Sequence, residues 1–219
     1  ATIPSAALWS PNHPYVYRAR LSLLRGAELV DAVESGFGMR EIAIDGPYIL
    51  LNGKRLMLHG YGDDHIYPVE MALSSDKAVH LKRLRMIKSY GFNHVRHHST
   101  VMPPEYYEAC DEVGIMPTCE FPIVYAQFLP GTGELWKKNV PENASPEPAT
   151  ETYRREWTAA IKRHRNHPSI LCWVMGNELW SGIPLRNDFQ RIARELDPTR
   201  PFADADGVGK DILKPEQDR

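Results

Sequence analysis

The sequence of 219 residues lacks a long hydrophobic run and carries almost no net charge. No apolar stretch approaches the roughly 20 residues that a helix needs to span a bilayer, so no membrane span is expected. Lys and Arg number 26 and Asp and Glu 28, which gives a formal net charge of -2. This balance offers no electrostatic attraction to nucleic acid or to an anionic membrane surface. We therefore expect neither nucleic acid nor a membrane as a partner.

Cysteine is also scarce, with only Cys110, Cys119 and Cys172 in the chain. Three cysteines cannot all pair with one another, and their spacing fits neither a zinc site nor a redox dithiol. The sequence also contains no His-Glu-x-x-His motif, no phosphate loop and no Gly-x-Gly-x-x-Gly. We expect no resident metal and no nucleotide, and we expect Cys110 and Cys172 to be small buried hydrophobic residues.

What is present is an ordinary globular composition, with 42% apolar and 25% charged residues. Residues 15–24 and 29–33 alternate as strands do, and a turn at residues 26–28 lies between them. A second hairpin is predicted at residues 48–54, around the Asn52-Gly53 turn. Two or three strands leave one sheet face without a partner, so residues 1–38 are expected to belong to a larger β-domain.

After residue 38 the pattern changes to strands that alternate with helices, which is typical of a parallel sheet. Strands are expected at residues 56–59, 92–96, 115–120 and 170–175 and from 201 onward, with helices at residues 75–90, 103–113, 151–164 and 184–196. Ser75 is a plausible N-cap of the first helix, and residues 122–149 are predicted to form a long loop. The expected fold is α/β, a partial (β/α)8 barrel with about five of the eight strands.

Such an arc would leave two unpaired edges and an exposed inner face. We therefore expect the chain to be a fragment that packs against the remainder of the barrel. Autonomous folding as a monomer is not expected.

The most informative stretch is residues 165–178, RNHPSILCWVMGNE. His167-Pro168 ends the preceding helix, because the residue before a proline is pushed out of the helical region. The apolar run at residues 170–174 fits a strand buried on both faces. Asn177 and Glu178 then follow its carboxyl end, where barrel enzymes carry their chemistry. Partial burial favours the protonated form of a carboxyl group, so Glu178 is a candidate general acid. The alternative is a glutamate that caps the next helix or faces solvent.

Several blocks of the sequence resemble family 2 of the glycoside hydrolases, the β-galactosidase and β-glucuronidase family. They are residues 8–17 (LWSPNHPYVY), 36–42 (GFGMREI), 51–60 (LNGKRLMLHG), 84–96 (LRMIKSYGFNHVR), 110–115 (CDEVGI) and 165–178. The resemblance covers nearly the whole chain in the family's order. It implies that residues 1–38 are the last strands of an immunoglobulin-like β-sandwich domain. Residues 39–219 would then be the first part of a (β/α)8 glycosidase catalytic domain.

The resemblance also implies a function, the retaining hydrolysis of β-linked O-glycosidic bonds in an oligosaccharide or glycoside. Retaining enzymes use two carboxylates about 5–5.5 Å apart. Glu178 matches the family's acid/base, and the nucleophile would be a second Glu beyond residue 219, so this chain alone is expected to be inactive. Asn177 would hold the sugar's 2-hydroxyl, and Arg96 would support the nucleophile. A turn-forming Asn and a salt bridge at the rim are the alternatives for these two residues.

The other expected sugar-binding residues lie where this sequence departs in part from the family's pattern. Glu120 ends the third strand, where the family often has an acidic residue near the sugar or a magnesium ion, but a lone carboxylate is a weak metal argument. Asp64 stands where the β-galactosidases carry a His. The family's Thr-Ser-His-Tyr-Pro after Arg96 is replaced, so His98 or Ser99 would substitute for the sugar-contacting His. Trp180 would be a sugar platform or a core residue.

Two other functions are compatible with the sequence. A β-mannanase- or cellulase-like barrel shares the Asn-Glu pair after the fourth strand but lacks the upstream Leu-Trp-Ser-Pro block. A non-catalytic remnant that binds carbohydrate or protein would keep the fold without turnover. The sequence does not decide the sugar, the linkage, the compartment, or whether the protein is a homo-oligomer.

Overall fold

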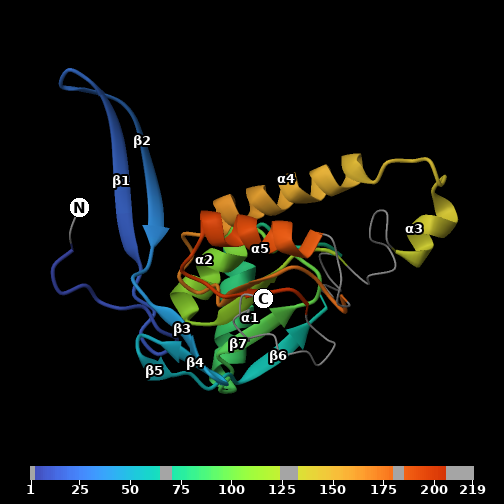
Figure 1. The fold of residues 1–219 in the computed structure, drawn as a ribbon. Coiled ribbons are helices and arrows are strands. Elements are labelled where there is room, and N and C mark those ends of the chain that lie inside the picture. Colours follow the sequence, from blue (N-terminus) through green and yellow to red (C-terminus); the bar gives the residue numbers. More distant parts are fainter. Residues whose placement is uncertain (1–2, 65–70, 124–132, 180–184, 206–219) are drawn as a thin grey trace.

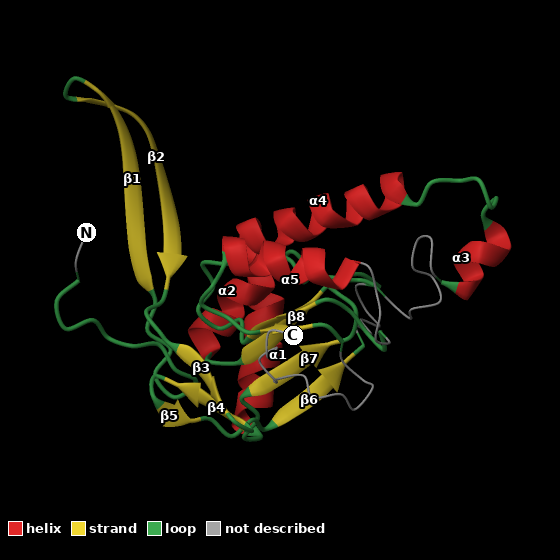
Figure 2. Ribbon diagram, in the orientation of Figure 1, coloured by secondary structure: helices red, strands yellow, loops and turns green. Residues whose placement is uncertain are grey.

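A computed structural model describes residues 3–64, 71–123, 133–179 and 185–205 of the chain. The described residues form a long N-terminal hairpin, a small antiparallel sheet and a larger unit of strands and helices (Figures 1 and 2). Within this part of the chain, no helix is long and apolar enough to cross a membrane.

One five-stranded sheet organises the larger unit, with the strand order β10-β9-β8-β7-β6 and parallel pairing throughout. Its strands are β6 (Gly60–Asp63), β7 (His94–His97), β8 (Met116–Glu120), β9 (Cys172–Val174) and β10 (Phe202–Ala203). The parallel order confirms the predicted arc of a (β/α)8 barrel. The first barrel strand was predicted four residues too early, at residues 56–59. Leu56 and Leu58 pack against the core, but parallel pairing with β7 begins only at Gly60.

The helices that connect the strands lie against one face of this sheet (Figure 2). They are α1 (Lys77–Ser89), α2 (Pro104–Val113), α4 (Glu147–His164) and α5 (Leu185–Leu196). Asp76, not the predicted Ser75, caps α1, because its side chain accepts a hydrogen bond from the amide of Ala78. The predicted loop at residues 122–149 contains the short helix α3 (Glu134–Asn139) and the first residues of α4.

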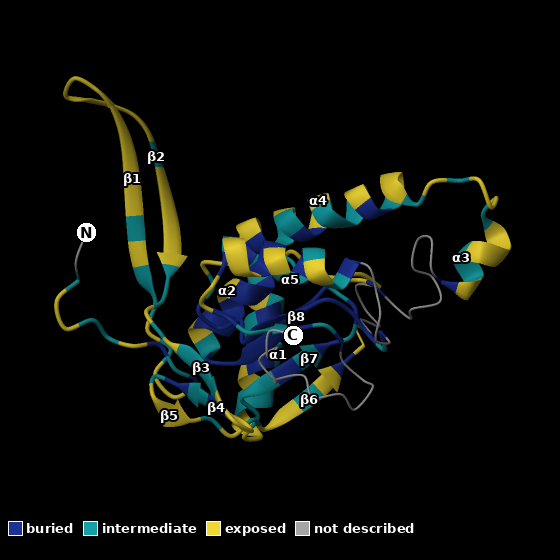
Figure 3. Ribbon diagram, viewed as in Figure 1, coloured by how far each residue is buried: buried dark blue, intermediate teal, exposed yellow. Residues whose placement is uncertain are grey.

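The alternation of side chains along each strand divides the core into two clusters. The buried residues lie mostly in the larger unit of strands and helices, whereas the N-terminal hairpin is largely exposed (Figure 3). Val95, Cys119 and Trp173 face the helices and are fully or almost fully buried there. Met116, Cys172 and Val174 face the other side of the sheet, which would be the barrel interior. Arg96, Thr118 and Glu120 share this inner face because of the register between β7, β8 and β9. The sheet therefore carries two of the predicted site residues toward the interior.

The N-terminal strands β1 (Tyr17–Arg25) and β2 (Glu28–Phe37) pair as an antiparallel hairpin that projects from the body (Figure 1). Leu21, Leu23 and Val33 on this hairpin are more than 60% exposed. A separate antiparallel sheet contains β3 (Ile42–Asp45), β4 (Tyr48–Leu51) and β5 (Lys54–Arg55). Both hairpin predictions are confirmed, although assignment of residues 1–38 to an immunoglobulin-like domain stays a prediction.

The three cysteines are free and buried. Burial raises the pKa of the Cys110 thiol well above its ordinary value and that of Cys119 to about 12. Both side chains therefore stay as neutral thiols, in line with the role of small hydrophobic residues.

Candidate active site

Three of the predicted site residues meet where β7, β8 and β9 end. Arg96 is the third residue of β7, Glu120 is the last residue of β8, and Asn177 follows β9 by three residues. The carboxyl ends of parallel strands lie at one edge of a barrel, and this edge is where barrel enzymes bind substrate. Residues 24 and 81 positions apart in the chain are thereby in direct contact.

Glu120 and Arg96 form a two-point ion pair inside this site. The Nε of Arg96 donates to Oε2 of Glu120 at 3.1 Å, and its Nη2 donates to Oε1 at 3.3 Å. The Glu120 side chain is fully buried, while that of Arg96 is 24% exposed. A fork of two hydrogen bonds fixes the plane of the guanidinium group as well as its position. Glu120 therefore orients Arg96 and is already occupied by protein contacts.

Ser99 provides two further donors to the same carboxylate. Its backbone amide donates to Oε1 of Glu120 at 2.7 Å, and its Oγ donates to the same oxygen at 3.2 Å. Ser99 is buried, and its backbone has a φ of 51°, in the left-handed region that few non-glycine residues adopt. The sequence predicts Ser99 only as a substitute for a sugar-contacting His. No local pattern identifies its bond to a carboxylate 21 residues away.

Asn177 is the third member of the cluster and is 2% exposed. Its Oδ1 accepts a hydrogen bond of 2.6 Å from Nη2 of Arg96. This contact fixes the orientation of the amide, because the oxygen faces Arg96 and the nitrogen must face elsewhere. Nδ2 is buried and has no hydrogen-bond partner within the described part of the chain. A buried donor without an acceptor is costly, so this atom is suited to a ligand oxygen.

Glu178 adjoins this cluster and is half-buried. Gly176 makes the local path possible, because a Cβ at this position would lie 2.4 Å from the carbonyl oxygen of Ile123. The amide of Asn177 donates to that same oxygen at 2.9 Å. Glu178 itself has a φ of 50°, a strained conformation for a non-glycine residue that persists where the surroundings enforce it. The chain after β9 thus turns sharply at the predicted acid.

The remaining predicted residues lie around this cluster or outside the described residues. His98 is half-buried, and its backbone amide donates to the carbonyl of Asp63 at 3.1 Å. Asp64 is exposed just after β6. Trp180 lies outside the described residues. His97 faces the helices, where its ring packs 4.7 Å from that of Tyr106.

The described residues at this site do not fit a magnesium ion. Magnesium needs several oxygen ligands, whereas Glu120 already accepts four hydrogen bonds, two of them from a guanidinium group. In the described ranges, no group of three or more His, Cys, Asp or Glu could hold a metal ion.

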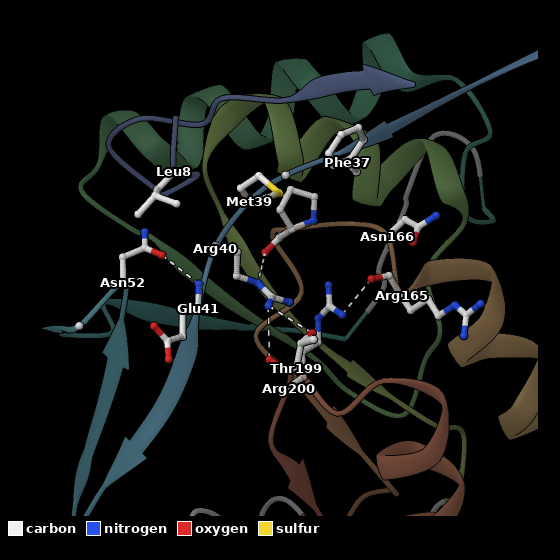
Figure 4. A pocket seen from close by; sticks show the side chains of 13 residues that line it. Leu8, Phe37, Met39, Arg40, Glu41, Asn52, Arg165, Asn166, Thr199 and Arg200 are labelled. Atoms are coloured by element: carbon white, nitrogen blue, oxygen red, sulfur yellow. Dashed lines mark hydrogen bonds between the residues drawn. The ribbon is translucent and has the colours of Figure 1, made fainter. Parts of the chain in front are cut away.

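A pocket of about 580 Å³ lies at the opposite end of the sheet, beside the residues that precede β9 and β10 (Figure 4). Arg40 crosses it and donates from Nε to the carbonyl of Pro168 at 3.2 Å and from Nη1 to Thr199 at 3.3 Å. Burial and the nearby Arg200 lower the pKa of Arg40 to about 9. Chemistry in barrels occurs at the other end of the strands, so we assign these contacts to the attachment of the residues after β2.

Comparison with known proteins adds independent findings. Residues 42–214 match the model of the TIM barrel domain of glycosyl hydrolases family 2, and residues 1–40 match a second model of glycosyl hydrolases family 2. A β-galactosidase of Alteromonas mediterranea is 29% identical over 213 residues, which cover 94% of this chain and 19% of that protein. The chain spans about a fifth to a quarter of the length of the curated relatives it matches.

Solved structures give the same result. A β-glycosidase from Bacteroides vulgatus is similar with a TM-score of 0.74 and 30% identity, over 90% of this chain and 24% of that one. A β-D-glucuronidase from Dictyoglomus thermophilum has a TM-score of 0.72 and 26% identity, over 90% of this chain and 34% of that one.

Proposed function

The chain belongs to family 2 of the glycosyl hydrolases, and from this premise we propose that it supplies part of the active site of a retaining β-glycoside hydrolase. The proposal gives Glu178 the role of acid/base. The nucleophilic carboxylate lies outside the described residues, in the remainder of the barrel. Arg96 and Asn177 position the sugar and that nucleophile. Relatives named as β-galactosidase and β-D-glucuronidase make β-galactosides and β-glucuronides the first substrates to test.

The proposed reaction has two steps. In the first, Glu178 donates its proton to the leaving glycosidic oxygen while the nucleophile attacks the anomeric carbon, which forms a glycosyl-enzyme intermediate. In the second, Glu178 as a carboxylate removes a proton from water, and the water oxygen displaces the nucleophile. The sugar leaves with its original anomeric configuration.

Asn177 has the clearest part in this scheme. Its Nδ2 would donate to the sugar's 2-hydroxyl, and hydrogen bonds to this hydroxyl strengthen in the transition state. The observation that carries the proposal is the 2.6 Å contact between Arg96 Nη2 and Asn177 Oδ1. It fixes a buried amide beside Glu178 with its donor available. A turn-forming Asn at the surface would need no such partner.

Replacement Glu178→Gln in the full-length protein tests the acid/base role. We expect hydrolysis of a substrate with a poor leaving group to fall by about 10²- to 10⁴-fold, the usual contribution of a general acid. Release of an activated phenol in the first step should fall much less, because that leaving group needs no proton. Azide, which attacks without a base, should restore turnover of the activated substrate and give a β-glycosyl azide.

Glu142→Gln is the matched control, since Glu142 is exposed and lies in the segment between α3 and α4. It should leave both rates unchanged. Equal losses on both substrates for Glu178→Gln, without azide rescue, would refute the acid/base role. A wild-type protein that binds the sugar but never turns it over would support the non-catalytic alternative.

A further inference from the structure

Ser99 stands out in this site because it donates two hydrogen bonds to Glu120 from a strained backbone. We propose that Ser99 is a positioning residue, which holds Glu120 so that Arg96 and Asn177 keep their orientation toward the sugar. This inference rests on the proposed glycosidase function and departs from the expectation that Ser99 contacts the sugar itself.

Nη2 of Arg96 is a donor that two acceptors share. This nitrogen lies 3.3 Å from Oε1 of Glu120 and 2.6 Å from Oδ1 of Asn177. Both donors of Ser99 bind the same Oε1. Any rotation of the Glu120 carboxylate therefore moves one of the two acceptors of Nη2, and the other acceptor is Oδ1 of Asn177. Ser99 prevents this rotation through its own two bonds to that oxygen.

Burial strengthens the contact between Ser99 and Glu120. Glu120 is fully buried and Ser99 is 9% exposed, so little water competes for the carboxylate and each bond to it is strong. The positive φ of Ser99 directs its amide and hydroxyl toward one oxygen, and a strained residue of this kind is kept where its contacts require it. These observations point to orientation of the charged cluster and not to general packing.

Ser99→Ala in the full-length protein removes only the hydroxyl. We expect kcat/KM for an aryl β-glycoside to fall on the order of tenfold, as for one lost hydrogen bond to a charged group. The effect should shrink to about twofold or less on the 2-deoxy analogue, because that substrate does not use the Asn177 amide and the two losses are not additive. A purely structural role would reduce kcat/KM equally for both substrates.

Ser99→Gly separates the hydroxyl from the backbone, since glycine adopts positive φ without strain. It should lose activity like Ser99→Ala while its melting temperature stays closer to that of the wild type. Thr100→Ala is the matched control, because the hydroxyl of Thr100 bonds only the neighbouring carbonyl of His98 within the described residues. It should keep wild-type kinetics. Full activity in both Ser99 variants, or equal losses on the two substrates, would overturn the proposal.

Crystal structures of the wild type and Ser99→Ala proteins test the inference without turnover. We expect the Arg96 Nη2 to Asn177 Oδ1 contact to lengthen beyond hydrogen-bond distance in the variant. An unchanged contact would refute the positioning role. A wild-type protein without glycosidase activity would refute the proposed function instead, so the two failures are distinct.

Discussion

The replacement Glu120→Gln should damage both stability and activity, because the shape is kept but one acceptor becomes a donor. With its oxygen at the Oε1 position, the introduced amide could still accept from Ser99 and from Arg96 Nη2. Its NH2 group would then face Nε of Arg96 at 3.1 Å, which is also a donor. The opposite orientation of the amide would lose three hydrogen bonds, from both Ser99 donors and from Arg96 Nη2, whereas the orientation described first loses one. The amide should therefore adopt the orientation described first.

The magnitude follows from this geometry. One lost hydrogen bond between charged groups costs about 1.5–3 kcal/mol, and the partial exposure of Arg96 places the loss near the lower end. A loss of about 2 kcal/mol corresponds to a fall of about 4–8 °C in the melting temperature of a domain of 150–250 residues. We expect a smaller fall than this in the melting temperature of the full-length protein, because the shift shrinks as the unfolding domain grows, together with a lower kcat/KM.

Glu195→Gln is the control, because Glu195 pairs with Arg191 at 3.2 Å on the surface of α5 and its side chain is 60% exposed. A surface i,i+4 pair contributes only about 0.3–0.5 kcal/mol, so its melting temperature should change little. Equal small shifts in the two variants would refute the view that Glu120 is the buried anchor of Arg96.

Two further predictions concern other parts of the same fold. Gly176→Ala should destabilise the protein by about 1–3 kcal/mol and reduce activity, because a Cβ 2.4 Å from the Ile123 carbonyl oxygen forces the Asn177 backbone to move. Thermal unfolding and enzyme kinetics test this, and an unchanged melting temperature and kcat/KM would contradict it. Burial, with smaller effects from His167 and Arg163, lowers the pKa of His164 to about 3. The unfolded chain, with its His at about 6.5, therefore binds a proton that the folded chain does not. The free energy of unfolding should therefore fall by about 2 kcal/mol between a pH above about 6.5 and about pH 5. Melting temperatures measured across this range should fall less steeply with decreasing pH in His164→Gln than in the wild type.

Much of the fold could be predicted from the sequence because its signals are local. The His167-Pro168 break, the apolar run after it and the Asn52-Gly53 turn each act on a few neighbouring residues. The structure confirms the strand β9 and the hairpin that these signals predict. The position of Asn177 beyond a barrel strand followed from the same local pattern.

Other features could not be predicted because they depend on contacts between distant residues. Leu56 and Leu58 are apolar and partly buried, as a strand would be, yet the ladder with β7 begins at Gly60. Nothing near Ser99 in the chain indicates that it donates to Glu120. The helix α3 lies in a stretch rich in Pro, Gly and Asn, a composition that favours a loop over a helix.

The left-handed backbone at Glu178 also bears on how such a protein could lose its chemistry. Glycine and asparagine adopt positive φ more readily than glutamate does, so either replacement would relax the chain as it removed the carboxylate. Under the proposed function, such a replacement would stabilise the backbone at the same time as it removed turnover.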